Sequence, residues 1–156
     1  MSVLDREVLA LMRDVAERII MPRHRALKAT DIIEKADDDL VTIADREAEV
    51  ALAEGLAKLH PEAAIVGEEA VHADPSVMDR LSGTCWIIDP IDGTKSFITG
   101  KPVFGTLIAL LRGGRPILGI IDQPVTGERW TGAAGLATTL NGEAVTTRSC
   151  GDLAVA

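Results

Sequence analysis

Two aspartates that follow an apolar run are the residues of this chain with the clearest capacity for chemistry. Asp89 comes directly after the apolar stretch 86–88, and Pro90 disfavours helical angles at Asp89, so a strand should end by presenting this carboxylate. Asp92 follows three residues later, across a segment that cannot pair regularly. Both carboxylates and the Ile91 carbonyl can therefore converge on one point. Such an all-oxygen set is typical of a Mg²⁺ site.

Gly93 and Thr94 come next and predict the start of a helix beside the two aspartates. Gly93 allows a close backbone turn, and the first N–H groups of a helix begun at Thr94 have no partners within that helix. A helix N-terminus of this kind binds anions such as phosphate. The alternative is structural, because Asp-Pro and Asp-Gly are common turn formers and Thr94 can serve as a cap. The combination of strand, paired aspartates, glycine and threonine favours the functional interpretation.

Three acidic residues further upstream, Asp45, Glu68 and Glu69, have structural as well as functional interpretations. Asp45 stands three residues after Thr42, which predicts a capping box at the start of a helix. The helix dipole stabilises an acid there without any catalytic duty, so the residues alone favour the structural interpretation of Asp45. Glu68 and Glu69 are adjacent, and on a strand they would point to opposite faces. Only one of them could then bind a given metal directly.

Composition restricts the classes of function. The 156 residues fit one domain (1–156), and the formal net charge of −8 argues against nucleic acid or a membrane surface as a partner, because both would repel the chain. No apolar run approaches the roughly 18 residues that span a bilayer, and the first residues lack a signal-peptide pattern, so we expect a cytoplasmic protein. Cys85 and Cys150 lack metal-ligand spacing and are expected to be reduced.

Two amphipathic helices are expected to lie near the start of the chain. Apolar residues recur at helical spacing over 4–19, and Pro22 should end or bend this helix. A second helix should begin at Thr42 and run to the residues just before Pro61.

Short β-like runs separated by glycine turns follow from residue 84 onward. The runs 103–111 and 116–121 flank two glycines and predict a hairpin, and Asn141-Gly142 marks another tight turn. Helices first and an antiparallel meander afterwards predict an α+β fold, with the helices packed on one face of an antiparallel sheet.

The run Asp89-Pro-Ile-Asp-Gly-Thr94 resembles the signature of the inositol monophosphatase superfamily and matches it without alteration. The segment from Lys35 to Asp45 and the segment Ile65-Val-Gly-Glu-Glu69 resemble two further family motifs, in the expected order. Within the family, several short strings are more similar to the histidinol-phosphate phosphatase branch than to the inositol-phosphate branch; they are Lys95-Ser96-Phe97, 121–124, 128–130 and 138–142.

The resemblance implies a Mg²⁺-dependent phosphatase that acts on a small phosphate monoester. By this resemblance, Glu68, Asp89, the Ile91 carbonyl and Asp92 would hold Mg²⁺. Two such ions, about 3.5 to 4 Å apart in typical sites, polarise the phosphoryl group and stabilise the leaving oxygen.

The resemblance also assigns catalytic and phosphate-binding roles. Thr94 and Asp45 would form a pair whose hydroxyl helps to deprotonate the attacking water, and Glu68 would assist. Backbone N–H groups of Gly93 and Thr94 would bind phosphate oxygens.

A layered αβαβα fold is implied as well, of which this chain corresponds to the first half. Family members continue through a second half-domain with a further metal-binding aspartate, and no matching motif occurs here. We therefore expect weak or no activity from this chain. We also expect a homo-oligomer, or a complementing C-terminal half, to cover the sheet surface that is otherwise exposed.

Two alternatives to a histidinol-phosphate phosphatase stay open. One is a phosphatase for inositol 1-phosphate or for a nucleotide 3′-phosphate, which uses the same chemistry. The other is a non-catalytic metal-binding or assembly module that has kept the fold.

Overall fold

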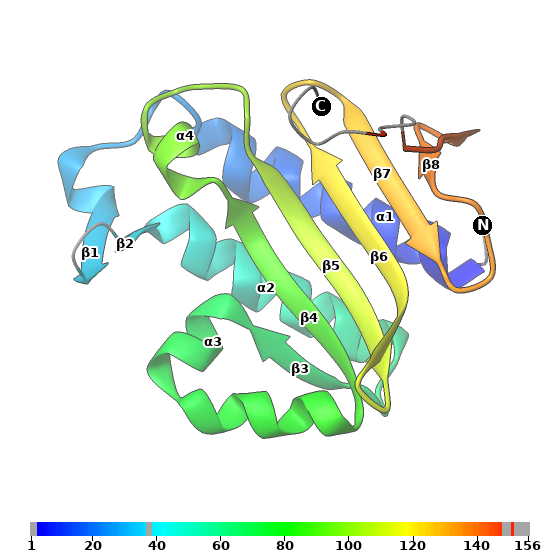
Figure 1. Ribbon diagram of the computed structural model, residues 1–156. Helices are drawn as coiled ribbons and strands as arrows, with labels where there is room; N and C mark the ends of the chain where they lie inside the picture. The colour runs from blue at the N-terminus through cyan, green and yellow to red at the C-terminus, as the bar shows by residue number, and fades with distance from the viewer. Residues whose placement is uncertain (1–2, 37–38, 148–150, 152–156) are drawn as a thin grey trace.

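The computed structural model describes residues 3–36, 39–147 and 151 (Figure 1). The α-helices are α1 (Val3–Val15), α2 (Ile43–Leu59), α3 (Glu68–Ala73) and α4 (Thr94–Ile98). The strands are β1 (Ile32–Ala36), β2 (Asp39–Thr42), β3 (Ala64–Gly67), β4 (Thr84–Asp92), β5 (Gly105–Arg112), β6 (Arg115–Gln123), β7 (Glu128–Ala133), β8 (Thr139–Leu140) and β9 (Glu143–Ala144). A π-helical segment, η1 (Ala16–Ile20), and three 3-10 segments, η2 (Met21–Arg23), η3 (Ala29–Asp31) and η4 (Pro75–Ser82), complete the set.

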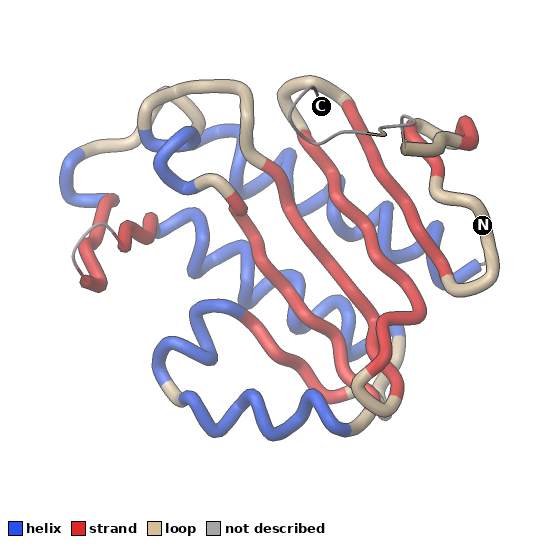
Figure 2. Tube along the Cα trace, in the orientation of Figure 1, coloured by secondary structure: helices blue, strands red, loops and turns tan. Residues whose placement is uncertain are grey.

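A seven-stranded sheet in the order β3-β4-β5-β6-β7-β8-β9 forms the centre of the fold. Helices α1 and α2 cover one of its faces, while β1 and β2 pair apart from it (Figures 1 and 2). The predicted α+β class is confirmed. Strands β3 and β4 pair in parallel, unlike the antiparallel pairs in the rest of the sheet. The reason is that α3 and η4 carry the chain across between them, and parallel neighbours need such a crossover.

Both predicted helices are present. Helix α1 buries Val8, Met12 and Val15, then continues through η1 into η2, where Pro22 lies and the helical path ends. Helix α2 starts after Thr42 and stops at Leu59, just before the predicted boundary.

The core lies between these helices and the sheet. Ile88, Ile108 and Ile120 face one another across three strands and are almost completely buried. Together with Trp86 on β4 and Leu52 on α2, they belong to one apolar cluster. This packing fixes β4, which carries Asp89 and continues past the predicted end there to Asp92, against α2, whose first turn holds Asp45.

The two predicted turns are confirmed. Gly113 and Gly114 both have positive φ and connect β5 to β6 in an antiparallel hairpin. Asn141 and Gly142 also have positive φ and connect β8 to β9, as a tight two-residue hairpin turn requires.

The other face of the sheet carries an open apolar groove. Asp89, Leu107, Ile121 and Trp130 pair across β4 to β7 and form one row; the next row is Ile87, Ala109, Gly119 and Gly132. These residues line a cavity of about 480 Å³, and Ile121 is 41% exposed. No described helix crosses this groove, whereas α1 and α2 lie behind the sheet (Figure 1).

Two further features bear on the composition. None of the helices in the described ranges is long and apolar enough to cross a membrane. Cys85 is buried, and burial raises the pKa of its thiol. Cys150 lies outside the described residues.

Candidate active site

The end of β4 is shaped by a bulge between its two aspartates. Asp89 pairs with Leu107 and Asp92 pairs with Gly105, so β4 has one residue more than β5 over this stretch. The buried Thr106 hydroxyl donates to the Pro90 carbonyl at 2.8 Å and holds the bulge in place. The irregular pairing predicted for this segment is therefore confirmed.

Gly93 and Thr94 turn the chain out of the bulge into α4. Gly93 has φ of 89°, a conformation that favours glycine, and a Cβ there would also make a tight contact of 3.1 Å with the Val103 carbonyl oxygen. Helix α4 is only five residues long and begins at Thr94, as predicted. The Thr94 hydroxyl donates to the Ile91 carbonyl at 3.1 Å, and it lies 3.4 Å from Asp45 Oδ1.

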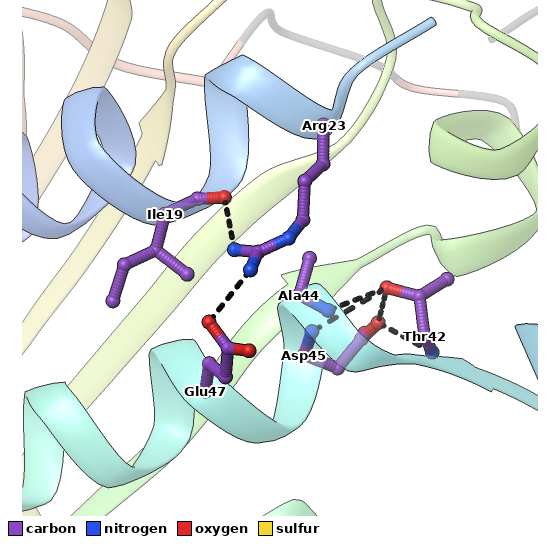
Figure 3. Close-up of polar contacts among 6 residues, drawn as sticks. All are labelled: Ile19, Arg23, Thr42, Ala44, Asp45 and Glu47. Atoms are coloured by element: carbon purple, nitrogen blue, oxygen red, sulfur yellow. Dashed lines mark hydrogen bonds and ion pairs between the residues drawn. The ribbon is translucent and has the colours of Figure 1, made fainter. Parts of the chain in front are cut away.

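The two carboxylate oxygens of Asp45 have different partners. Its Oδ2 accepts the Thr42 N–H at 2.8 Å and the Thr42 hydroxyl at 2.5 Å, which completes the predicted capping box (Figure 3). Its Oδ1 faces the Thr94 hydroxyl. The cap and the contact with Thr94 coexist, so the two interpretations left open for Asp45 are compatible. Thr42, which the sequence indicated only as a cap, is completely buried and fixes this side chain.

A neighbouring ion pair holds the start of α2 against the end of the first helical segment. Arg23 donates from Nη2 to Glu47 Oε2 at 2.8 Å and from Nη1 to the Ile19 carbonyl at 3.0 Å (Figure 3). Glu47 is two residues from Asp45, so this contact restrains the same turn of α2.

Glu68 and Glu69 lie in the first turn of a helix, not on a strand as the sequence analysis assumed. Strand β3 ends at Gly67, and α3 begins at Glu68. The Glu69 and Ala70 N–H groups donate to the buried Glu49 carboxylate at 2.8 and 2.9 Å, which lets the helix start here. Glu68 hydrogen-bonds the Asp89 carboxyl, and the charge of Glu69 acts on Asp45. Both glutamates therefore lie near Asp45 and Asp89, with which they and Asp92 form an acidic cluster.

The electrostatics of Asp89 indicate that the cluster would bind a cation. Burial, followed by the negative charges of Glu68 and Asp92, raises the pKa of Asp89 to about 7. Its Oδ1 is buried without a hydrogen-bond partner. Burial also raises the pKa values of Asp45 and Glu49. A divalent ion would supply the missing partner and offset the repulsion.

The acidic side chains are nevertheless not yet arranged as a complete set of metal ligands. Within the described ranges, no three His, Cys, Asp or Glu side chains stand in an arrangement that could hold a metal ion. The carboxylates influence one another, and Glu68 contacts Asp89 directly. Binding an ion would therefore require small side-chain movements. The bulge fixes the backbone at Asp89, whereas the rotamers of the surrounding carboxylates can adjust more easily.

Three of the short segments that are similar to the histidinol-phosphate phosphatase branch contact one another in the structure. Arg129 Nε donates to the buried Asp122 Oδ1 at 2.7 Å, and the Arg129 N–H donates to Asn141 Oδ1 at 2.9 Å. Asp122 pairs with Thr106, the residue that holds the Pro90 carbonyl. These segments therefore contact one another beside the strand that holds the bulge. Their contacts do not indicate which substrate the site would bind.

Comparison with known proteins decides the family. The model described as the inositol monophosphatase family matches residues 4–156. The chain belongs to the inositol monophosphatase family. Bifunctional phosphatase IMPL2, chloroplastic, of Arabidopsis thaliana is 53% identical over 129 residues, which are 83% of this chain and 36% of that protein. A histidinol-phosphatase of Chlorobaculum parvum is 40% identical over 118 residues, or 76% of this chain and 44% of that protein.

A solved structure supports the same assignment of fold. The Thermotoga maritima IMPase matches 95% of this chain and 54% of its own chain, with a TM-score of 0.81 and 28% identity. The chain thus spans about a third to a half of the length of the relatives named here. Residues 89–94, which match the signature of this family, form the bulge and the turn described above.

The raised pKa of Asp89 predicts a pH-dependent effect of Asp89→Asn. An unfolded Asp loses its proton near 3.8, whereas the folded Asp89 keeps it to about 7. The folded state therefore binds more protons in this window, and its stability falls as pH rises through it. Without metal, Asp89→Asn should be more stable than the native chain at about pH 8 and equal to it at about pH 4.

Urea denaturation with a chelator present measures this effect. Asp79→Asn changes an exposed aspartate in η4 and serves as the control, which should show no such difference. An Asp89→Asn effect of equal size at both pH values would contradict the account.

Proposed function

We propose that residues 1–156 form the N-terminal domain of a Mg²⁺-dependent phosphomonoesterase. The observation that carries the proposal is the unpartnered, buried oxygen of Asp89 among the carboxylates of Glu68, Asp92 and Asp45. A phosphate ester brings further negative charge, so a cation is needed before it can bind there.

The metal ligands in this proposal are Glu68, Asp89, the Ile91 carbonyl and Asp92. The bound Mg²⁺ would neutralise charge on the phosphoryl group as the ester bond breaks. The bulge supports this assignment because it places the Ile91 carbonyl beside the Thr94 hydroxyl at 3.1 Å, with Asp89 and Asp92 on either side of it in sequence.

Asp45, Thr94 and Gly93 complete the proposed machinery. Asp45 Oδ1 receives a proton from the attacking water through the Thr94 hydroxyl, which lies 3.4 Å away, and Glu68 assists. Burial raises the pKa of Asp45, which suits a group that must accept a proton. The N–H groups at Gly93 and Thr94 bind phosphate oxygens, because the first N–H groups of α4 lack partners inside the helix.

Histidinol phosphate is the proposed substrate. The 40% identical relative that is named a histidinol-phosphatase supports it. Inositol 1-phosphate and a nucleotide 3′-phosphate are the alternatives, since they require the same chemistry at phosphorus. A cytoplasmic location stays a prediction.

Phosphate release from these three substrates, with and without Mg²⁺, tests the proposal. We expect weak Mg²⁺-dependent turnover of histidinol phosphate, well below the median of about 10 per second for enzymes. Asp89→Asn should abolish it, and Asp79→Asn should not. Release within tenfold of that median would contradict the expected weakness. Silence on all substrates, together with Mg²⁺ binding that Asp89→Asn removes, would favour the non-catalytic module instead.

The open sheet face is proposed to be covered by a second copy of the chain or by a complementing C-terminal half. The groove is apolar, and Leu107, Ile121 and Trp130 form a row along it. An exposed apolar surface of this kind is typical of an interface.

Light scattering after gel filtration tests self-association. The native chain should form an oligomer, and Ile121→Glu should shift it towards monomer because a charge would be buried in the interface. Val50→Glu is the control, since Val50 is 60% exposed on α2, away from the groove. A monomeric native chain would contradict self-association and leave the complementing half as the cover.

A further inference from the structure

Glu49 makes an unusual contact for a side chain in the middle of a helix. Its carboxylate is buried, with the residue 7% exposed, and it accepts the Glu69 N–H at Oε2 and the Ala70 N–H at Oε1, at 2.8 and 2.9 Å. These two N–H groups belong to the first turn of α3, where a helix has no acceptors of its own. Glu49 on α2 therefore caps α3 from a different element.

Gly67 explains why the cap comes from elsewhere. It occupies the N-cap position of α3 and has no side chain to accept these bonds. Its φ of −99° is open to any residue, so the backbone does not require glycine. A Cβ at this position would lie only 2.3 Å from Glu49 Cδ. Glycine is thus needed to make room for the carboxylate.

The arrangement joins the two elements that carry the acidic cluster. Glu49 stands one helical turn after Asp45 on α2, so both acids lie on the same face of the helix. Glu68 lies between Gly67 and the two capped N–H groups, and its carboxyl contacts Asp89. Movement of the first turn of α3 would move Glu68 away from Asp89.

We propose that Glu49 and Gly67 are positioning residues that fix the first turn of α3 and thereby hold Glu68 in place as a metal ligand. The inference rests on the proposed function, in which Glu68 binds Mg²⁺. Glu49 does not touch the ion or the substrate. It acts through two backbone hydrogen bonds, which are strong because the acceptor is charged.

Two variants on different elements test the pair. Glu49→Gln keeps the size of the side chain but loses its charge and one of its two acceptors. Gly67→Ala places a methyl group where the carboxylate lies. Glu54→Gln makes the same chemical change at an exposed position of α2 and is the matched control.

Two measurements separate a positioning role from a merely structural one. Amide hydrogen exchange at Glu69 and Ala70 measures how well the Glu49 carboxylate protects these two N–H groups. Mg²⁺ titration calorimetry measures the metal affinity to which Glu68 is proposed to contribute. Both Glu49→Gln and Gly67→Ala should accelerate this exchange and weaken Mg²⁺ affinity by about 10–100-fold, as loss of a residue that orients a metal ligand commonly does. Glu54→Gln should change neither.

The outcomes distinguish this inference from the proposed function. Unchanged Mg²⁺ affinity in Glu49→Gln, with native affinity that depends on Asp89, would overturn the positioning role and leave the metal site standing. Unchanged exchange at Glu69 and Ala70 would overturn it as well. A native chain without Mg²⁺ affinity would overturn the proposed function, and this inference with it.

Discussion

The burial of Asp89 among other carboxylates is the constraint on which the rest of the site depends. Burial and neighbouring charge raise the pKa of Asp89 to about 7, and one of its oxygens has no hydrogen-bond partner. Such a group lowers the stability of a protein without bound metal near neutral pH. A chain that buries such a carboxyl needs strong local restraints to hold it in place. A bound cation is the simplest partner that would offset the cost of burying its charge.

Each restraint is a hydrogen bond between a side chain and the backbone near the cluster. Thr106 holds the bulge through the Pro90 carbonyl, and Thr42 fixes one oxygen of Asp45 in the capping box. The Glu49 carboxylate caps α3. Because each bond involves a main-chain atom, the acidic side chains project from fixed positions, and only their rotamers would need to change for an ion to bind at the proposed site.

Local sequence patterns were enough to predict part of this arrangement. The strand that carries Asp89, the capping box of Asp45 and the Asn141-Gly142 turn depend on residues within a few positions of one another, although β4 continues past the predicted end at Asp89 to Asp92. The helical start at Glu68 was missed because its cap comes from Glu49, about twenty residues away. The parallel pairing of β3 was missed for a similar reason, since the crossover through α3 and η4 decides it. Contacts that join distant segments leave no short-range signal in one sequence.

The central claim is that the carboxylates of Glu68, Asp89 and Asp92 bind a divalent cation. Crystals of the chain grown with Mn²⁺, which has a usable anomalous signal, test it most directly. The account predicts an anomalous peak bonded to the free oxygen of Asp89 and to the Ile91 carbonyl, with Glu68 or Asp92 completing the contact. Crystals saturated with Mn²⁺ that show no peak at Asp89 would contradict it.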